Sequence, residues 1–174
     1  MVELSGHLSR ERDLELVGRS WHPWVRRALL LLLFAFAVAA LFNAFGQGST
    51  LSVAHAPAAT LSVDAPKRVR GGLIFEGRFE IEANQTIAHP TLVLSNGWIE
   101  GITLNSLEPA PEAETSRGDE LRLRFATLPV GEKLTVWTQW QVNPVNVGTQ
   151  SQDVQLYDGA QRLAAIDRDV TVFP

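Results

Sequence analysis

The chain has 174 residues, of which 45% are hydrophobic and 20% charged, with a formal net charge of -4. This length predicts about one domain. The absence of cysteine excludes disulfide frameworks, thiolate metal sites and cysteine nucleophiles. The part after residue 45 is acidic, which excludes a strongly basic nucleic-acid-binding protein, and no nucleic-acid partner is expected.

Residues 28–45 form an apolar run that contains one polar residue, Asn43, and no charge. A bilayer core of about 30 Å needs about 20 such residues in a helix. We therefore predict a transmembrane helix over 25–45 that is retained as a signal anchor in the lipid bilayer. The alternative is a cleaved signal peptide, but this run is longer than the usual apolar region, and the A-x-A site at 54–56 lies well beyond it and is followed by Pro57.

Charges on the two sides of the apolar run predict its orientation. Arg12 and Arg19 precede it, whereas the first cation after Phe45 is Lys67. The positive-inside rule places residues 1–24 in the cytoplasm as a short tail and residues 46–174 outside the cell membrane, in a single-pass layout. We expect four residues to anchor the helix at the membrane interface: Trp21, Trp24, Arg26 and Arg27. Small residues four apart make four alanines candidates for contact with another helix: Ala35, Ala39, Ala40 and Ala44.

The outer part is predicted to be a β-domain on a flexible tether. Residues 46–60 are rich in Gly, Ser, Ala and Thr, which is typical of a linker. After them the apolar residues alternate, most clearly over 73–83 and 133–142. The dipeptides Asn96-Gly97 and Asp158-Gly159 separate such runs and predict two-residue hairpin turns. The fold class is therefore mainly β: one transmembrane α-helix, then an Ig-like antiparallel β-sandwich of about seven to nine strands over 61–174.

Residues 121–136, LRLRFATLPVGEKLTV, resemble the strand–"lpaGe"–strand signature of Ig-like domains in bacterial surface proteins. The later segments QDVQLYDG (152–159) and VTVFP (170–174) fit the last strands of that pattern. The whole layout is similar to an uncharacterised group of short actinobacterial single-pass membrane proteins. That resemblance implies a companion role beside a YetF-like membrane protein, and it brings no catalytic residues with it.

Motifs for chemistry are sparse in the outer part. His55 and His89 have no metal-ligand spacing, and we expect no catalytic residue, no metal site and no cofactor. Asp167 and Asp169 sit at a turn where they could bind a cation, although no EF-hand pattern surrounds them. The tripeptide 117–119 reads Arg-Gly-Asp, which matches an adhesion motif but is equally ordinary turn chemistry.

Tryptophans give the better indication of a binding surface. Trp137 and Trp140 lie three apart on one predicted strand, so they face opposite sides. Trp140 shares the face of Val136 and is the expected core residue, which turns Trp137 outward. Exposed tryptophans are enriched at binding surfaces. The candidate partner-binding residues are therefore Trp137, Trp98 beside the Asn96-Gly97 turn, and Gln139.

Two functions remain open from the sequence. The first is a non-enzymatic, membrane-anchored accessory protein whose outer domain binds another membrane or envelope protein. The second is an extracytoplasmic module that binds cell-wall glycan or a cation, because an exposed tryptophan beside polar loops can stack on sugar rings. We do not expect an enzyme.

Overall fold

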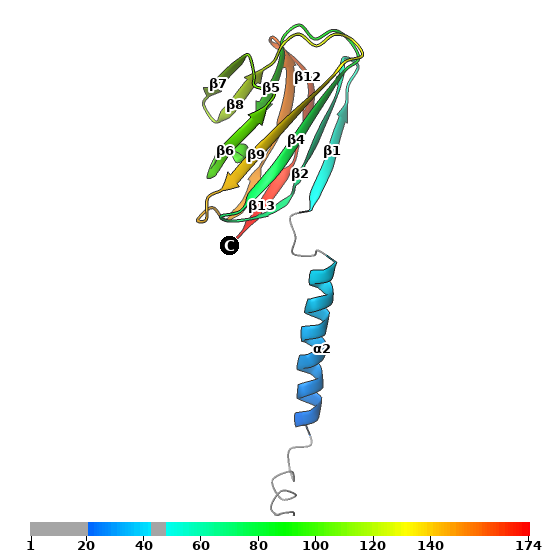
Figure 1. The fold of residues 1–174 in the computed structure, drawn as a ribbon, viewed down its shortest axis with the longest axis vertical. Coiled ribbons are helices and arrows are strands. Elements are labelled where there is room, and N and C mark those ends of the chain that lie inside the picture. Colours follow the sequence, from blue (N-terminus) through cyan, green and yellow to red (C-terminus); the bar gives the residue numbers. More distant parts are fainter. Residues whose placement is uncertain (1–20, 43–47) are drawn as a thin grey trace, which may run out of the picture. The chain divides into compact units, whose positions relative to one another are not determined.

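The computed structural model describes residues 21–42 and 48–174 (Figure 1), which fall into two compact units, Met1–Phe45 and Gly46–Pro174. The first unit contains helix α2 (His22–Leu41), with proline in its first turn. Its mean hydropathy reaches 2.0 and none of that window is buried, so by length and composition the helix can cross a membrane. It starts three residues before the predicted span. Most of the predicted tail, 1–20, and the end of the predicted span, 43–45, lie outside the described residues.

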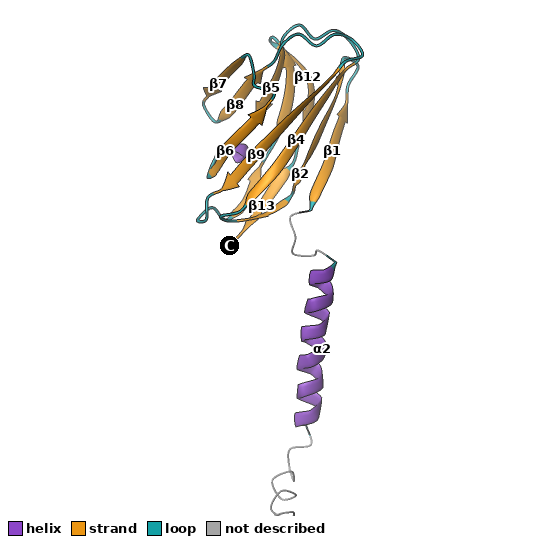
Figure 2. Cartoon of the chain, viewed as in Figure 1, coloured by secondary structure: helices purple, strands orange, loops and turns teal. Residues whose placement is uncertain are grey.

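The second unit is a β-sandwich, as the alternation predicted. Two five-stranded sheets pack face to face (Figures 1 and 2). The first sheet has the strand order β1-β2-β4-β9-β6, and the second has the order β12-β11-β5-β8-β7. A third, three-stranded sheet has the order β10-β13-β3. All neighbouring strands are antiparallel except the pair β13 and β3.

The described residues form thirteen strands, more than the seven to nine predicted, because several are only three to five residues long. Their bounds are β1 Ser49–His55, β2 Ala59–Pro66, β3 Arg68–Arg70, β4 Ile74–Ala83, β5 Pro90–Leu94, β6 Ile102–Glu108, β7 Ala113–Arg117, β8 Glu120–Arg124, β9 Lys133–Val142, β10 Gly148–Ser151, β11 Val154–Asp158, β12 Gln161–Ile166 and β13 Asp169–Phe173.

Alternation builds the core between the two large sheets. Every second residue is buried along β4 and, on β9, from Val136 to Val142, and the residues between them are exposed or half-buried. The centre holds three aromatic side chains: the ring of Trp98 lies 5.2 Å from that of Phe79 and 5.3 Å from that of Trp140. The Trp140 indole donates to the buried Thr138 hydroxyl (2.7 Å), which itself donates to the carbonyl of Gly77 (2.8 Å). The hydrogen bond to Thr138 satisfies the indole N–H, which is the one polar group that the Trp140 side chain brings into the core.

The flexible tether predicted over 46–60 is wrong for most of its length. Residues Ser49–His55 are strand β1, which pairs with β2 over seven positions from Ser49↔Pro66 to His55↔Thr60. Its Ser, Thr and Ala content resembles a linker, but the sequence also alternates, with Thr50, Ser52 and Ala54 less exposed than their neighbours. Pairing with β2 gives this polar strand the hydrogen bonds that its composition did not suggest.

The hairpin predicted at Asn96-Gly97 is also wrong. These residues form a short 3-10 helix, Asn96–Trp98, and β5 pairs with β11 and β8 rather than with β6. A Cβ atom at Gly97 would collide with the backbone carbonyl of Ser151, so the chain needs glycine here to pass close to β10. In contrast, Asp158-Gly159 does connect the paired strands β11 and β12, as predicted.

One cation is buried in the sandwich. Only 4% of Arg168 is exposed, its guanidinium lies 5.1 Å from the Trp98 ring, and one Nη donates to the carbonyls of Ala65 and Pro66. Burial lowers the pKa of Arg168 to about 10, so the side chain stays charged at neutral pH. Its two neighbours, Asp167 and Asp169, are exposed.

Candidate functional site

Trp137 lies near the middle of β9, on the outward face of the first sheet, and 50% of it is exposed. Trp140 on the same strand is fully buried, as the spacing of three predicted. Directly across the sheet, the register pairs Trp137 with Arg78 on β4 and with Glu108 on β6. The Arg78 guanidinium lies 5.2 Å from the centre of the indole ring, within the range of a cation–π contact.

Ion pairs fix Arg78 beside Trp137. Arg78 contacts Asp64 on β2 at 3.1 Å and Glu80 at 3.8 Å, and Glu80 contacts Lys133 at 2.7 Å. The hydrogen bond from Lys133 holds the pKa of Glu80 below its ordinary value of 4.5. These partly exposed pairs contribute little to stability, but they hold the cation over the aromatic ring.

We call the outward surface of the first sheet the Trp137 face. Besides Trp137 it presents three exposed apolar side chains, two from β1 and one from β4: Leu51, Val53 and Ile74. It carries two cations, Arg78 and Lys133, and five acids: Asp64, Glu76, Glu80, Glu82 and Glu108. Three of these acids form no ion pair within the described residues: Glu76, Glu82 and Glu108. The face is therefore acidic with an aromatic centre.

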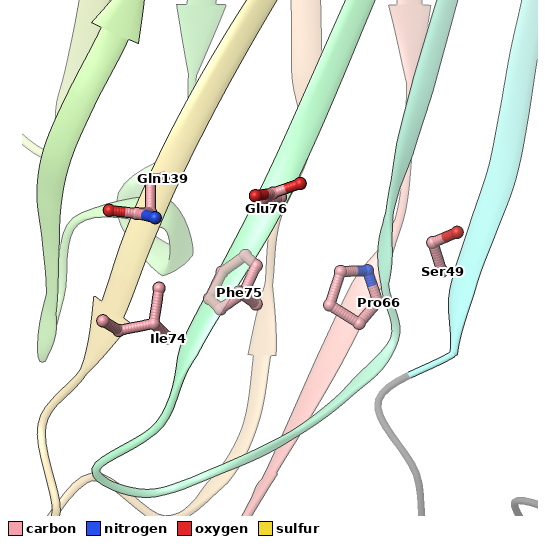
Figure 3. Close-up of a pocket in the computed structure, with 6 residues that line it drawn as sticks. All are labelled: Ser49, Pro66, Ile74, Phe75, Glu76 and Gln139. Carbon is pink, nitrogen blue, oxygen red and sulfur yellow. The ribbon is translucent and has the colours of Figure 1, made fainter.

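A hollow of about 400 Å³ lies on this face where β2 and β4 are no longer paired, and its lining includes Gln139, two residues from Trp137 on β9 (Figure 3). Glu76 and Gln139, which are register partners on β4 and β9, line one side of it. Ile74, Phe75, Pro66 and Ser49 complete its lining. A carboxylate, an amide and apolar walls can together receive the end of a long basic side chain, whose stem packs on carbon while its charge meets Glu76.

Trp98 is not a surface residue, and its prediction as a partner-binding residue is wrong. It is fully buried, and its indole donates to the carbonyl of Gln152 at 3.0 Å. The Asn-Gly dipeptide suggested an exposed turn, but the 3-10 helix points the ring into the core. Gln139 is half-buried on the Trp137 face and lines the hollow, and its role in partner binding stays a prediction.

The predicted membrane-interface residues lie at the start of α2. Trp21 and Trp24 are exposed, and the Arg27 guanidinium lies 5.3 Å from the Trp24 ring. Arg26 lies in the same first turns of the helix. Ala35, Ala39 and Ala40 lie in its second half, whereas Ala44 falls outside the described residues. Nothing in this arrangement tests the orientation of the helix or its contact with another helix.

The other motifs are ordinary parts of the fold. Gly118 and Asp119 make the two-residue turn between β7 and β8, with Arg117 paired to Glu120 and a φ of 63° at Gly118. His55 lies at the end of β1 and contacts the Thr60 hydroxyl at 3.4 Å. Among the described residues no three His, Cys, Asp or Glu side chains are grouped to hold a metal ion.

Arg78 and Glu76 are the site residues that sequence reasoning did not single out. The alternation of 73–83 did place both on the outward face. What was missing was the neighbour of that strand, because nothing local in the sequence shows that β4 and β9 lie side by side across 49 intervening residues. One signal could have found the pair: Arg78 is an outward-facing arginine on a strand with the same alternation as the strand of Trp137.

No protein-family model and no curated protein sequence matches this chain. Solved structures give distant likenesses. A non-cellulosomal cohesin from Archaeoglobus fulgidus is 10% identical, with a TM-score of 0.39 and coverage of 73% of this chain and 92% of the cohesin. CaCohA2 from Clostridium acetobutylicum is 12% identical, with a TM-score of 0.41 and coverage of 72% and 91%. A β-glucosidase from Listeria innocua is 16% identical, with a TM-score of 0.35 and coverage of 71% and 16%. Values this low carry no inference about function.

Proposed function

We propose that this chain is a membrane-anchored interaction protein whose Trp137 face binds a basic surface of another membrane or envelope protein. The observation that carries the proposal is the half-exposed Trp137 at the centre of an acidic sheet face. Aromatic residues in the middle of a patch contribute most of the binding energy at protein interfaces, and surrounding polar residues exclude water. The resemblance noted in the sequence makes a YetF-like membrane protein the first partner to test.

The charge of the face supports a basic partner. The carboxylates of Glu76, Glu82 and Glu108 form no ion pair among the described residues, and the face holds five acids against two cations, so it has an excess of negative charge. This charge would increase the association rate of a partner that presents lysine or arginine, and it would favour one orientation of that partner on the face. The hollow beside Gln139 gives one such side chain a defined place.

A sugar is a poorer fit to the same surface. Stacking on a sugar needs a free aromatic face, and Arg78 already lies over the ring of Trp137 at 5.2 Å. The ion pairs of Arg78 with Asp64 and Glu80 keep it there. We therefore treat cell-wall glycan as an outcome of the experiment below rather than as a second proposal.

Helix α2 supports the membrane-anchored part of the proposal. Helix α2 has the length and composition to cross a bilayer, and aromatic and cationic residues lie at its first turns. We propose that the helix is retained, that the N-terminus lies in the cytoplasm and that the sandwich lies outside, because the cations cluster before the apolar run 28–45.

Site-specific photo-crosslinking in the native host tests the proposal. A crosslinking amino acid at Gln139 should give one discrete protein adduct, identified by mass spectrometry as a membrane or envelope protein. The same group at Glu114, which is exposed on the edge strand β7 of the second sheet, is the matched control and should give no such adduct. Trp137→Ala should reduce the Gln139 adduct at least about fivefold, since losing a central aromatic residue costs about 1 kcal/mol or more.

Two results would refute the proposal. One is an equal pattern of adducts from Gln139 and Glu114, which would mean that the Trp137 face is not selective. The other is binding of purified wall glycan that Trp137→Ala abolishes, which would assign the face to a carbohydrate.

A further inference from the structure

The outward face of the second sheet holds a hollow whose chemistry is opposite to that of the Trp137 face. It has a volume of about 480 Å³. Arg122 and Arg124, two apart on β8, lie on one side of that strand's alternation, and both line the hollow. The register places Thr91 of β5 beside Arg124 and Thr115 of β7 beside Arg122, and both hydroxyls belong to the lining as well.

The hollow is basic in a domain that is acidic overall. The described residues that line it include no carboxylate, but they include two guanidinium groups and the imidazole of His89. Two acids that contact these groups are already engaged: Glu120 binds one Nη of Arg122 at 2.9 Å. Asp158 accepts from the backbone N–H of His89 at 2.8 Å and lies 4.0 Å from the Nδ1 of its imidazole. Two arginines this close repel each other, so an anion between them relieves an unfavourable arrangement.

Several donors in the hollow are unused. The Nε of Arg122 is buried and has no hydrogen-bond partner. Among the described residues the guanidinium of Arg124 makes no ion pair and no hydrogen bond. Meanwhile Arg122 is held in place by Glu120 and by the ring of Tyr157, whose centre lies 5.8 Å away. A side chain fixed in this way loses little conformational entropy when it binds a ligand.

We propose that this hollow binds the phosphate group of a phosphorylated small molecule, polymer or lipid headgroup. Two guanidiniums, the Thr115 hydroxyl and an imidazole surround the space, which is more donors than the two oxygens of a carboxylate can use. The Thr91 hydroxyl already donates to the carbonyl of His89 at 3.1 Å, so it can only accept from a ligand. A phosphate group offers oxygens in several directions, and arginine matches them with paired N–H groups. The volume exceeds that of phosphate alone, so part of the attached organic group fits too. This second site is independent of the proposed protein interaction.

Calorimetry on the full chain in phosphatidylcholine nanodiscs tests the proposal, with inorganic phosphate and sn-glycerol 3-phosphate as soluble probes at about 0.15 M NaCl. Arg124→Gln removes a cation that has no structural partner. It should raise the dissociation constant about tenfold, because a charge-assisted hydrogen bond contributes about 1.5 kcal/mol or more. Arg162→Gln is the matched control: it removes the same charge from an exposed position on β12 of the same sheet, outside the hollow, and should change the constant less than about twofold.

A vesicle arm separates the two sources of phosphate. Co-flotation of the nanodisc-held chain with phosphatidylcholine vesicles, with and without phosphatidylglycerol, reports binding to a lipid headgroup. Binding of the soluble probes assigns the site to a phosphorylated small molecule or polymer. Flotation that requires phosphatidylglycerol and is lost in Arg124→Gln assigns it to lipid. The proposal is overturned if neither soluble probe binds and phosphatidylglycerol causes no flotation. It is also overturned if Arg124→Gln and Arg162→Gln weaken binding equally, since net charge alone would then explain the effect.

Discussion

The hydroxyl of Thr138 offers a sharp test of how the core of the sandwich is held. It is buried, it donates to the carbonyl of Gly77 at 2.8 Å, and it accepts from the indole of Trp140 at 2.7 Å. Thr138→Val keeps the shape of the side chain but removes both interactions. Losing the hydrogen bond costs about 1 kcal/mol, and leaving the indole N–H buried without a partner costs about 1–3 kcal/mol more. We expect the free energy of unfolding to fall by about 3 kcal/mol.

A double-mutant cycle separates the two contributions. In a Trp140→Phe background there is no indole N–H to leave unpaired, so Thr138→Val should cost only about 1 kcal/mol. The coupling between the two positions should therefore be about 2 kcal/mol. Thr135→Val, on the outward face of the same strand, is the matched control and should change stability by less than about 0.5 kcal/mol.

Urea unfolding of residues 46–174, followed by far-ultraviolet circular dichroism, measures these changes without relying on tryptophan emission. With a slope of about 2 kcal/mol per molar urea, Thr138→Val should lower the midpoint by about 1.5 M. An equal cost of Thr138→Val in both backgrounds would show that the indole does not depend on the hydroxyl, and the reasoning would be refuted.

Three further changes test other parts of the fold. Gly97→Ala should prevent folding or cost more than about 3 kcal/mol, seen as loss of a cooperative urea transition, because its Cβ would collide with the Ser151 carbonyl. Glu80→Gln should reduce the loss of stability between pH 7 and pH 3: the folded pKa of Glu80 is depressed by Lys133, so its contribution is present above about pH 4.5 and disappears as pH falls through the folded pKa. Arg168→Met should change the free energy of unfolding by less than about 1.5 kcal/mol. The substitution loses two hydrogen bonds, but it also removes a buried cation whose Nε and one Nη have no partner, so the two effects offset each other. A loss above about 3 kcal/mol in urea unfolding would contradict that balance.

Alternation predicted the parts of the fold that depend on one strand at a time. The predicted strand 133–142 has the bounds of β9, and Val136, Trp140 and Trp137 lie on the sides that the period of two assigned. The sandwich follows from the same patterns, since strands that are apolar on one side must bury that side.

Features that depend on distant neighbours were not predictable from local sequence. The burial of Trp98 follows from the close approach of Gly97 to β10, which lies more than fifty residues later in the chain. Strand β1 was missed because Ser and Thr satisfy the composition of a linker as well as that of a strand. Arg78 joined the site only through the register of β4 with β9, and register is a property of the pairing rather than of either strand.

The opposite charges of the two large sheets give the domain an electrical polarity. The outward surface of the second sheet carries Arg117, Arg122, Arg124 and Arg162 against Glu120, while the Trp137 face has an excess of acids. Such a domain rotates in the electric field of an approaching charged molecule before contact, so a larger share of encounters has the orientation needed for binding. Its association rate with a basic partner should therefore fall steeply between about 0.05 and 0.5 M NaCl, while the dissociation rate changes little. Stopped-flow measurements that found both rates insensitive to salt would show that this polarity plays no part in the encounter.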